Sequence, residues 1–257
     1  MFTSMNQPPA PTAEPSRRAD AASTRGKLVI KRNEPEPKAL TLFWSLYLLV
    51  AAGTTIFAVN HLWIYDANDF RLSSKVMLAM VGLGIGALWP MVRLSQVAPN
   101  KTAESVFADA VALCVPAQAV LWPLTLLGGW SWGVTSAIAL AIIAWTLAIG
   151  GIIALGIGFR TTVGRSAWMI VAMAALLGAP LWALNAGWTT EHQLLVDWRL
   201  CSPLTMGWGM TGTLFGGAAR LTPDKWNGVL VPGASAAILW AIYAMTAGLR
   251  RAITARP

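Results

Sequence analysis

The chain has 257 residues, of which 56% are apolar and only 12% are charged, whereas about 25% of the residues in a typical soluble domain are charged. This composition excludes an ordinary soluble protein and indicates an integral membrane protein. The formal net charge of +8 comes from 19 basic and 11 acidic residues. These charges are unevenly placed, so the uncharged gaps between them locate the membrane spans.

Residues 1–38 come first and differ in kind from the rest. The stretch QPPAPTAEPSRRADAASTRGK is rich in Pro, Ala and charge and has no aromatic residue, so it cannot bury enough apolar surface to offset its ordering entropy. We expect a disordered, basic cytoplasmic tail over residues 1–38. No apolar signal-peptide run precedes Ala39, so the first span is expected to remain as an anchor.

Six membrane spans are expected after the tail, because a helix needs roughly 20 mostly apolar residues to cross the hydrocarbon core. The longest uncharged gap, between Asp109 and Arg160, is long enough for two helices, and GGWSWG at 128–133 supplies the turn between them. The sequence therefore predicts an all-α, polytopic membrane helical bundle. Its spans are expected at residues 39–60, 76–92, 107–127, 133–158, 166–185 and 229–249.

A further uncharged gap, residues 200–219, precedes the last span. It contains five Gly, one Pro, one Ser and three Thr, which makes it the least helical of the gaps. We expect a re-entrant segment at residues 202–217 that dips in from the outer side and returns, since irregular backbone at membrane depth persists where protein buries it or where it lines a watery cavity. A seventh span is the alternative.

The charge distribution predicts the orientation. Seven Lys and Arg lie in the tail, and six spans place 14 of the 19 basic residues on the same side as that tail. By the positive-inside rule both ends, including a C-terminal tail at 251–257, are cytoplasmic, and we expect a bacterial plasma membrane. Seven spans would lower the inside count only to 13, so charge alone decides weakly. The pI near 10.1 is thus a topology signal, with the lipid bilayer as partner, and it indicates no nucleic acid.

The stretch GWGMTG, Gly207 to Gly212, matches the dinucleotide-binding spacing G-x-G-x-x-G. That motif requires a preceding strand and a helix within a βαβ unit, and the sequence offers neither. We therefore expect no nucleotide here and no cofactor elsewhere. The glycines are interpreted as packing positions: Gly212 pairs with Gly216 and Gly82 with Gly86 in G-x-x-x-G spacing.

The sequence gives little support for catalysis or for a metal-binding site. No expected span holds an ionisable residue in its interior, and Asp109 lies at a cytoplasmic edge, which disfavours a carboxylate-driven antiporter. Two histidines, His61 and His192, fall in outer loops with several carboxylates; a site for metal-assisted hydrolysis is one interpretation, and a solvated loop pair is the favoured one. The two cysteines, Cys114 and Cys201, lack metal-ligand spacing. We expect no enzyme and no metal site.

Six spans with both ends inside, and a Gly- and Pro-rich outer dip before the last span, resemble the membrane subunit of type-2 ABC exporters. The resemblance covers residues 39–250 by topology. It implies a dimer of permeases, a separate cytoplasmic ATPase and a lipidic or hydrophobic substrate. It places ATPase docking in the loop 93–105, with candidates Arg93, Lys101 and Glu104. Candidate translocation or re-entrant residues are Ser202, Pro203, Thr205, Gly207, Trp208, Gly209 and Gly212.

Two rival functions remain open. One is a non-catalytic membrane scaffold that holds a partner, so that the chain is part of a hetero-oligomer. The other, less favoured, is an outer-facing membrane enzyme that uses the His- and Asp-containing loops.

Overall fold

The computed structural model describes residues 37–60, 67–96, 98–99, 101–159, 161–185, 197–212 and 221–254. All described residues belong to one compact unit, residues 35–257. Residues 1–36 of the tail expected at 1–38 lie outside the described residues, as do the outer-loop histidines His61 and His192 and Gly216.

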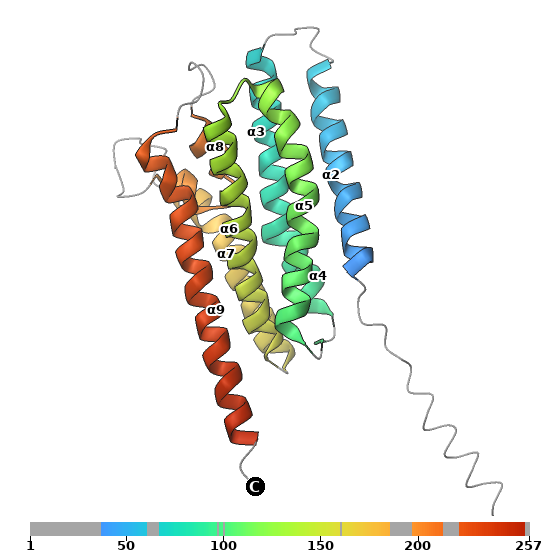
Figure 1. Ribbon diagram of the computed structural model, residues 1–257, viewed down its shortest axis with the longest axis vertical. Coiled ribbons are helices and arrows are strands. Elements are labelled where there is room, and N and C mark those ends of the chain that lie inside the picture. The colour runs from blue at the N-terminus through green and yellow to red at the C-terminus, as the bar shows by residue number, and fades with distance from the viewer. Residues whose placement is uncertain are drawn as a thin grey trace, which may run out of the picture. The chain divides into compact units, whose positions relative to one another are not determined.

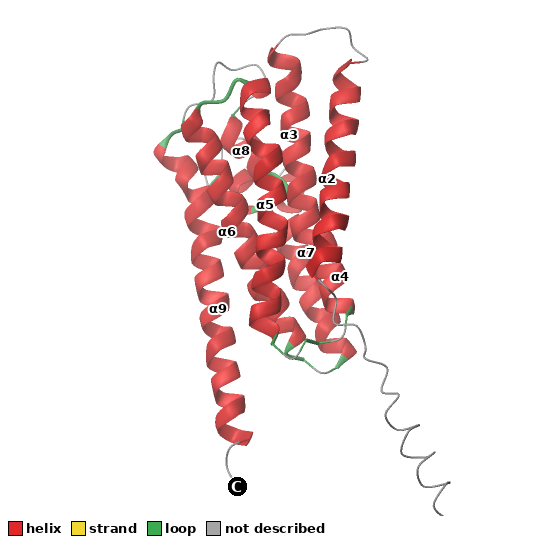
Figure 2. Cartoon of the chain, turned by 45° about the vertical axis from the view of Figure 1, so that its right-hand side comes forward, coloured by secondary structure: helices red, strands yellow, loops and turns green. Residues whose placement is uncertain are grey.

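Helices account for the described secondary structure, and no strand occurs in those ranges (Figure 2). The fold class expected from composition, an all-α helical bundle, is confirmed. In chain order (Figure 1) the elements are α2 (Pro37–Asn60), α3 (Ala67–Leu83), the π-helical η1 (Gly84–Leu88), α4 (Trp89–Ser95), α5 (Thr102–Gly128), α6 (Trp132–Ile157), α7 (Thr162–Asn185), η2 (Trp198–Cys201), α8 (Met206–Thr211), η3 (Pro223–Trp226) and α9 (Asn227–Thr254).

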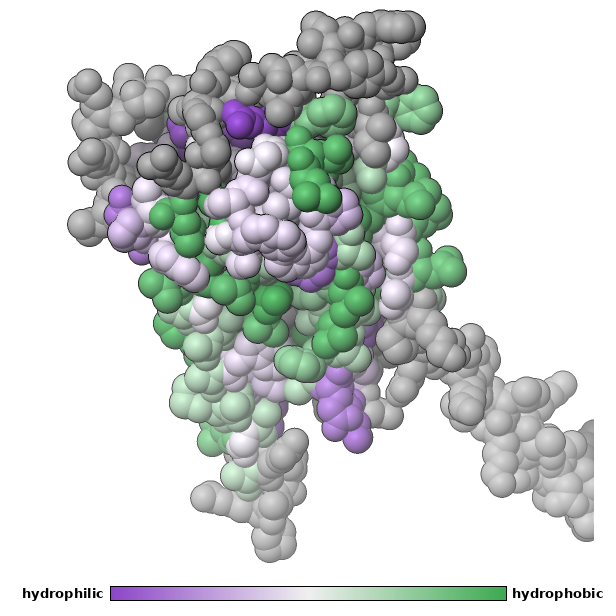
Figure 3. Space-filling view, turned by 45° about the horizontal axis from the view of Figure 1, so that its top comes forward, coloured by the Kyte–Doolittle hydropathy of each residue, from purple (hydrophilic) through white to green (hydrophobic). Residues whose placement is uncertain are grey.

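Five helical stretches are long and apolar enough to cross a membrane, and α2 contains a shorter apolar helix at Ala39–Thr55. The five are Phe70–Ser95, Thr102–Gly128, Trp132–Ile157, Thr162–Asn185 and Pro223–Arg250. Apolar residues cover much of the visible sides of the bundle, with polar residues nearer its ends (Figure 3). The chain is an integral membrane protein. The helices extend into both expected tails: α2 begins at Pro37, within the tail expected at 1–38, and α9 continues to Thr254, four residues into the expected C-terminal tail.

The second membrane helix changes its winding at η1. Pro90 has no N–H to donate to the carbonyl of Gly86, four residues earlier. The N–H of Trp89 bonds instead to the carbonyl of Gly84, which is the i to i−5 pattern of a π-helix. The helix therefore continues through α3, η1 and α4 with a wider turn rather than a break.

The turn expected at GGWSWG is confirmed. Helix α5 ends at Gly128, and Gly129 takes the left-handed conformation with φ of 62° that favours glycine. Ser131 then accepts a hydrogen bond from the N–H of Val134 and caps α6. This short connection makes α5 and α6 antiparallel neighbours.

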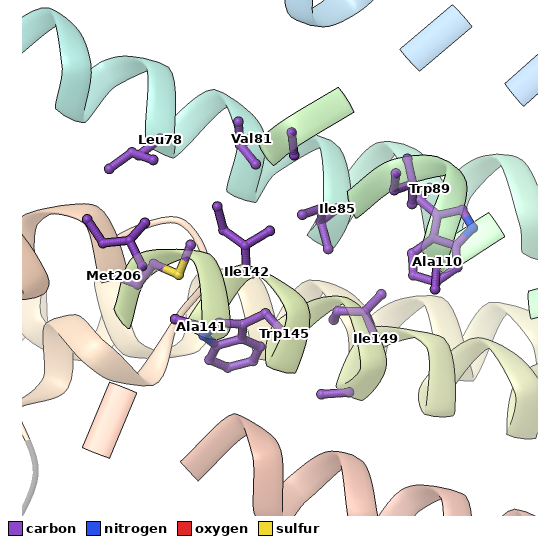
Figure 4. Close-up of a cluster of buried hydrophobic side chains, with 14 of the residues drawn as sticks. Leu78, Val81, Ile85, Trp89, Ala110, Ala141, Ile142, Trp145, Ile149 and Met206 are labelled. Carbon is purple, nitrogen blue, oxygen red and sulfur yellow. The ribbon is translucent and has the colours of Figure 1, made fainter. Parts of the chain in front are cut away.

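Helix α6 is the centre of the bundle. Its side chains Ile138, Ile142 and Ile149 are fully buried. Figure 4 shows Ile142 and Ile149 on the side of α6 that faces the helix carrying Leu78, Val81 and Ile85, with Met206 of α8 near Ile142. Within a bilayer these side chains stabilise the bundle by close van der Waals packing rather than by removal from water. The elements that carry the candidate site are therefore anchored on α6.

The connection from α7 to α9 begins and ends at the same end of the bundle. Helices α6 and α9 run in parallel, since Gly133 lies beside Leu221, Gly151 beside Leu239 and Gly158 accepts a hydrogen bond from Arg250. Four residues separate the end of α6 from the start of α7, which runs in the opposite direction (Figure 1). Residues 197–212 thus enter the bundle and leave it on one side, so this segment is re-entrant and does not form a seventh span.

Candidate functional site

The re-entrant segment begins with a capped turn and a buried serine. Asp197 accepts a hydrogen bond from the N–H of Arg199 and so caps η2. Ser202 is 0% exposed; its hydroxyl donates to the carbonyl of Leu176 in α7 at 2.5 Å and accepts from the N–H of Leu204 at 3.1 Å. The Leu176 carbonyl is available because Pro180, one turn later, has no N–H to give it. Ser202 therefore fills a gap in the hydrogen bonding of α7.

Glycine positions allow the segment to sit against the spans. A Cβ added to Gly82 in α3 would lie 2.1 Å from the carbonyl oxygen of Pro203, and one added to Gly207 would lie 2.9 Å from Leu78. A Cβ on Gly209 would meet Leu200 at 2.6 Å within the segment itself. The prediction of close packing is confirmed for Gly82, Gly207 and Gly209. It is wrong for Gly212, where an added Cβ would meet nothing within 4 Å. Residues Gly207–Thr211 of this stretch lie in the short helix α8 and Gly212 follows its end, so their amides are not arranged around a phosphate.

Two lysines hold the end of α8. Lys75 of α3 donates to the carbonyl of Gly212 at 2.8 Å, and Lys225 of η3 donates to the carbonyl of Met210 at 2.8 Å. These are carbonyls at the C-terminus of a helix, which lack partners inside it and carry partial negative charge. Gly212 has φ of 76° and ψ of −162°, a conformation that is essentially restricted to glycine.

Lys75 corrects the expectation that no span holds an ionisable residue. The gap-counting argument treated Lys75 as the limit of a span that begins at residue 76, but α3 already begins at Ala67 and Lys75 is 1% exposed. A buried ammonium is tolerated when it is hydrogen-bonded, and the Gly212 carbonyl supplies that bond. One turn earlier, the Nε of Arg71 donates to the carbonyl of Gly128 at 3.3 Å. Cationic side chains of α3 thus face the end of the bundle where α8 lies.

The opposite end of the bundle, where α4 ends and α5 begins, holds a buried ion pair. Arg93 of α4 and Asp109 of α5 are paired through Nε and Oδ2, with side-chain exposures of 4% and 3%. The indole N–H of Trp89 also donates to Oδ2 at 3.4 Å. Arg93 further donates to Gln96 Oε1 at 3.1 Å and to the Ser105 hydroxyl.

This burial corrects one candidate docking residue. Arg93 was expected on the surface of the loop 93–105, but it lies within α4 and forms a buried ion pair with Asp109. Its side chain is therefore not accessible to a partner protein. Lys101 and Glu104 do lie on the surface, with side-chain exposures of 74% and 70%, and they pair with each other at 3.0 Å. Only these two of the three residues are available for docking, which stays a prediction.

Neither cysteine joins a metal site in the described ranges, where no group of three or more His, Cys, Asp or Glu comes together. Cys114 and Cys201 are free thiols. Burial, and then the charge of Asp197, raise the pKa of the Cys201 thiol above its ordinary value. Cys201 therefore stays protonated at neutral pH and is a weak nucleophile.

The seven candidate re-entrant residues come together as one packed unit between α3, α6, α7 and α9. Sequence reasoning missed the two lysines and the Leu176 carbonyl that hold this unit. The free carbonyl of Leu176 could have been predicted from Pro180, because a proline inside a helix leaves the carbonyl one turn earlier without its helical donor. No family model, no curated protein and no solved structure matches the chain.

Proposed function

We propose that this integral membrane protein is the permease subunit of an exporter that moves a hydrophobic or lipidic substrate and is driven by a separate cytoplasmic ATPase. The observation that supports this best is the re-entrant segment 197–212. Irregular backbone at membrane depth is costly unless it is buried in protein or lines a path. Here the segment also accepts a hydrogen bond from a buried cation, Lys75. Charged side chains inside membrane proteins commonly mark substrate pathways.

The energy source belongs on another polypeptide. Gly207–Thr211 lie in a packed helix rather than in a phosphate-binding loop, so the proposal places the nucleotide on a partner chain. The exposed Lys101–Glu104 pair at the start of α5 is a surface that an ATPase could contact. Two exposed charges bind and release at little cost, because a surface ion pair contributes only about 0–1 kcal/mol.

The first test is purification of the full-length tagged protein from its native membranes in a mild detergent. We expect a P-loop ATPase to co-purify, and we expect the charge reversal Lys101→Glu to reduce its retention. Absence of any ATPase from repeated purifications would reject the exporter proposal.

The second test addresses the re-entrant segment in proteoliposomes that contain the purified complex. The probe is a phospholipid with a fluorescent head group, whose transfer between leaflets is followed by dithionite quenching with and without ATP. Gly82→Ala, which places a methyl group against the Pro203 carbonyl, should abolish ATP-dependent transfer while the ATPase stays bound. The matched variant Gly178→Ala, which has no atom within 4 Å of its added methyl group, should transfer the probe normally. Equal transfer by both variants would contradict a role for the segment in transport.

A non-transporting scaffold subunit is the second candidate, and one observation favours it. Ser202, Met206 and Met210 are at most 1% exposed, so the re-entrant segment is tightly packed where it lies. A scaffold predicts that Gly82→Ala weakens assembly with partner proteins, whereas the permease proposal predicts loss of transfer in an intact complex.

A further inference from the structure

A cavity of about 260 Å³ lies between α2, α4 and α5, beside the buried ion pair. Its walls are apolar and come from Ala39, Leu40 and Phe43 of α2 and Val92 of α4. Phe43 is 52% exposed, so the mouth of the cavity opens on the apolar side of the bundle. An apolar molecule can therefore enter from the surrounding lipid.

Hydrogen bonds fix the wall that α2 contributes. The indole N–H of Trp44 donates to the carbonyl of Leu113 in α5 at 2.8 Å, and the hydroxyl of Tyr47 donates to the carbonyl of Met80 in α3 at 2.9 Å. Trp44 is 2% exposed. These bonds lie next to Phe43 along α2, so the cavity is preformed rather than a gap between loosely packed helices.

The floor of the cavity is polar and has no net charge. It is formed by Arg93, Asp109 and Gln96, and the positive guanidinium is paired directly with the carboxylate. An ionic ligand would have to leave water without finding an uncompensated opposite charge, which is strongly unfavourable. The floor therefore favours a neutral head group.

Two polar atoms on this floor lack partners among the described residues. Asp109 uses Oδ2 for its hydrogen bonds, which leaves Oδ1 as a free acceptor. Gln96 accepts from Arg93 through Oε1, which leaves its Nε2 amide as a free donor. Neither atom is sealed in protein, since in the described ranges Trp145 Nε1 is the one fully buried side-chain nitrogen or oxygen without a partner. Both atoms are thus accessible, on residues that line the cavity.

We propose that this cavity binds a neutral amphiphile through a hydroxyl head group, with its apolar chain along α2. A hydroxyl donates one hydrogen bond and accepts others, so it can donate to Asp109 Oδ1 and accept from Gln96 Nε2 at once. A carboxylate would face Oδ1 with like charge, an ammonium could not accept from Gln96, and an alkane would leave both atoms unpaired. The proposal concerns a ligand site and does not depend on transport.

The test uses the full-length protein in nanodiscs of phosphatidylcholine, whose head group has no hydrogen-bond donor. The probe is 1-hexadecanol with a photoreactive diazirine in its chain, and the labelled peptides are identified by mass spectrometry. Unlabelled hexadecanol, hexadecanoic acid, hexadecylamine and hexadecane serve as competitors. We expect saturable labelling of peptides that contain Leu40, Phe43 or Val92, and we expect hexadecanol to compete best.

Three variants make the test specific. Leu40→Trp fills the cavity and should abolish saturable labelling, while Leu46→Trp, on the same helix but 56% exposed and outside the cavity, should leave it unchanged. Gln96→Leu should weaken hexadecanol binding about three- to tenfold, the effect of one neutral hydrogen bond, without changing competition by hexadecane. If Leu40→Trp does not fold, Val92→Phe narrows the same cavity from α4.

Three results would overturn the proposal. Equal labelling of the Leu40→Trp and Leu46→Trp variants would place the probe elsewhere. If hexadecane competed with the probe as well as hexadecanol does, the cavity would bind apolar chains without recognising a head group. Stronger competition by the acid or the amine would show that the floor recognises charge instead of a hydroxyl.

Discussion

Replacing Ser202 by alanine removes the hydroxyl that donates to the carbonyl of Leu176 at 2.5 Å. That carbonyl is inside α7 and lacks its ordinary helical donor because residue 180 is proline. A buried acceptor left without a partner costs about 1–3 kcal/mol. The N–H of Leu204 also loses its acceptor, so we expect Ser202→Ala to lower the free energy of unfolding by about 2–3 kcal/mol.

Pro180→Ala provides the decisive second change. An alanine at residue 180 has an N–H that can donate to the Leu176 carbonyl within α7. In this background the carbonyl no longer needs the Ser202 hydroxyl, so Ser202→Ala should cost less than about 1 kcal/mol. The free energies of unfolding of the wild type, both single variants and the double variant, measured by steric trapping in bicelles, give the coupling directly.

A matched serine shows what the loss of a hydroxyl costs when no carbonyl is orphaned. Ser235 in α9 donates to the carbonyl of Val231 at 2.9 Å, but that carbonyl also has the helical N–H of residue 235. Ser235→Ala should therefore change stability by less than about 0.5 kcal/mol. The reasoning is refuted if Ser202→Ala costs the same, within about 0.5 kcal/mol, with proline and with alanine at residue 180.

Three further predictions follow from other contacts. Gly82→Ala should lower the thermal midpoint by several degrees because its methyl group meets backbone, while Gly178→Ala, in open space within α7, should gain about 0.5–1 kcal/mol; similar midpoints would contradict this account. Arg93→Met should lower the free energy of unfolding by about 3–5 kcal/mol because it leaves a buried carboxylate unpaired. Lys101→Ala, at the exposed pair, should lower it by less than about 1 kcal/mol. Chemical unfolding of both variants measures this difference. Burial and a nearby carboxylate raise the pKa of Cys201, so in a Cys114→Ser background its maleimide reaction at pH 7 should be slower than that of a free thiol and should accelerate as the pH rises; a rate independent of pH would disprove it.

Helical periodicity was not needed to locate most of this fold, because charge gaps and turn residues sufficed. The long gap after Asp109 with GGWSWG inside it predicted α5, α6 and their turn, and the composition of residues 200–219 predicted a re-entrant segment. Both predictions rest on local properties: the transfer free energy of apolar runs and the conformational preferences of Gly and Ser. These properties are present in the sequence itself.

Long-range pairing could not be read in the same way. Charge counting places every Lys and Arg outside the membrane. Lys75 is nevertheless buried and donates to a carbonyl 137 positions away, and Arg93 is buried and paired with a carboxylate 16 positions away. Whether a charge is excluded or paired depends on the tertiary structure and not on its neighbours in the chain. The link between Ser202 and Pro180 has the same origin, since the freed carbonyl was foreseeable but its donor was not.

The hydrogen bond between Lys75 and Gly212 can form only late in the synthesis of the chain, because the acceptor is made long after the donor. Translation proceeds at about 5–20 residues per second, so the 137 residues that separate the pair take on the order of 10 s to make. Throughout that interval the second helix of the nascent chain carries an ammonium without the acceptor that it has in the finished protein. A truncated chain that ends before α8 lacks the Gly212 carbonyl, so its Lys75 never gains this hydrogen bond.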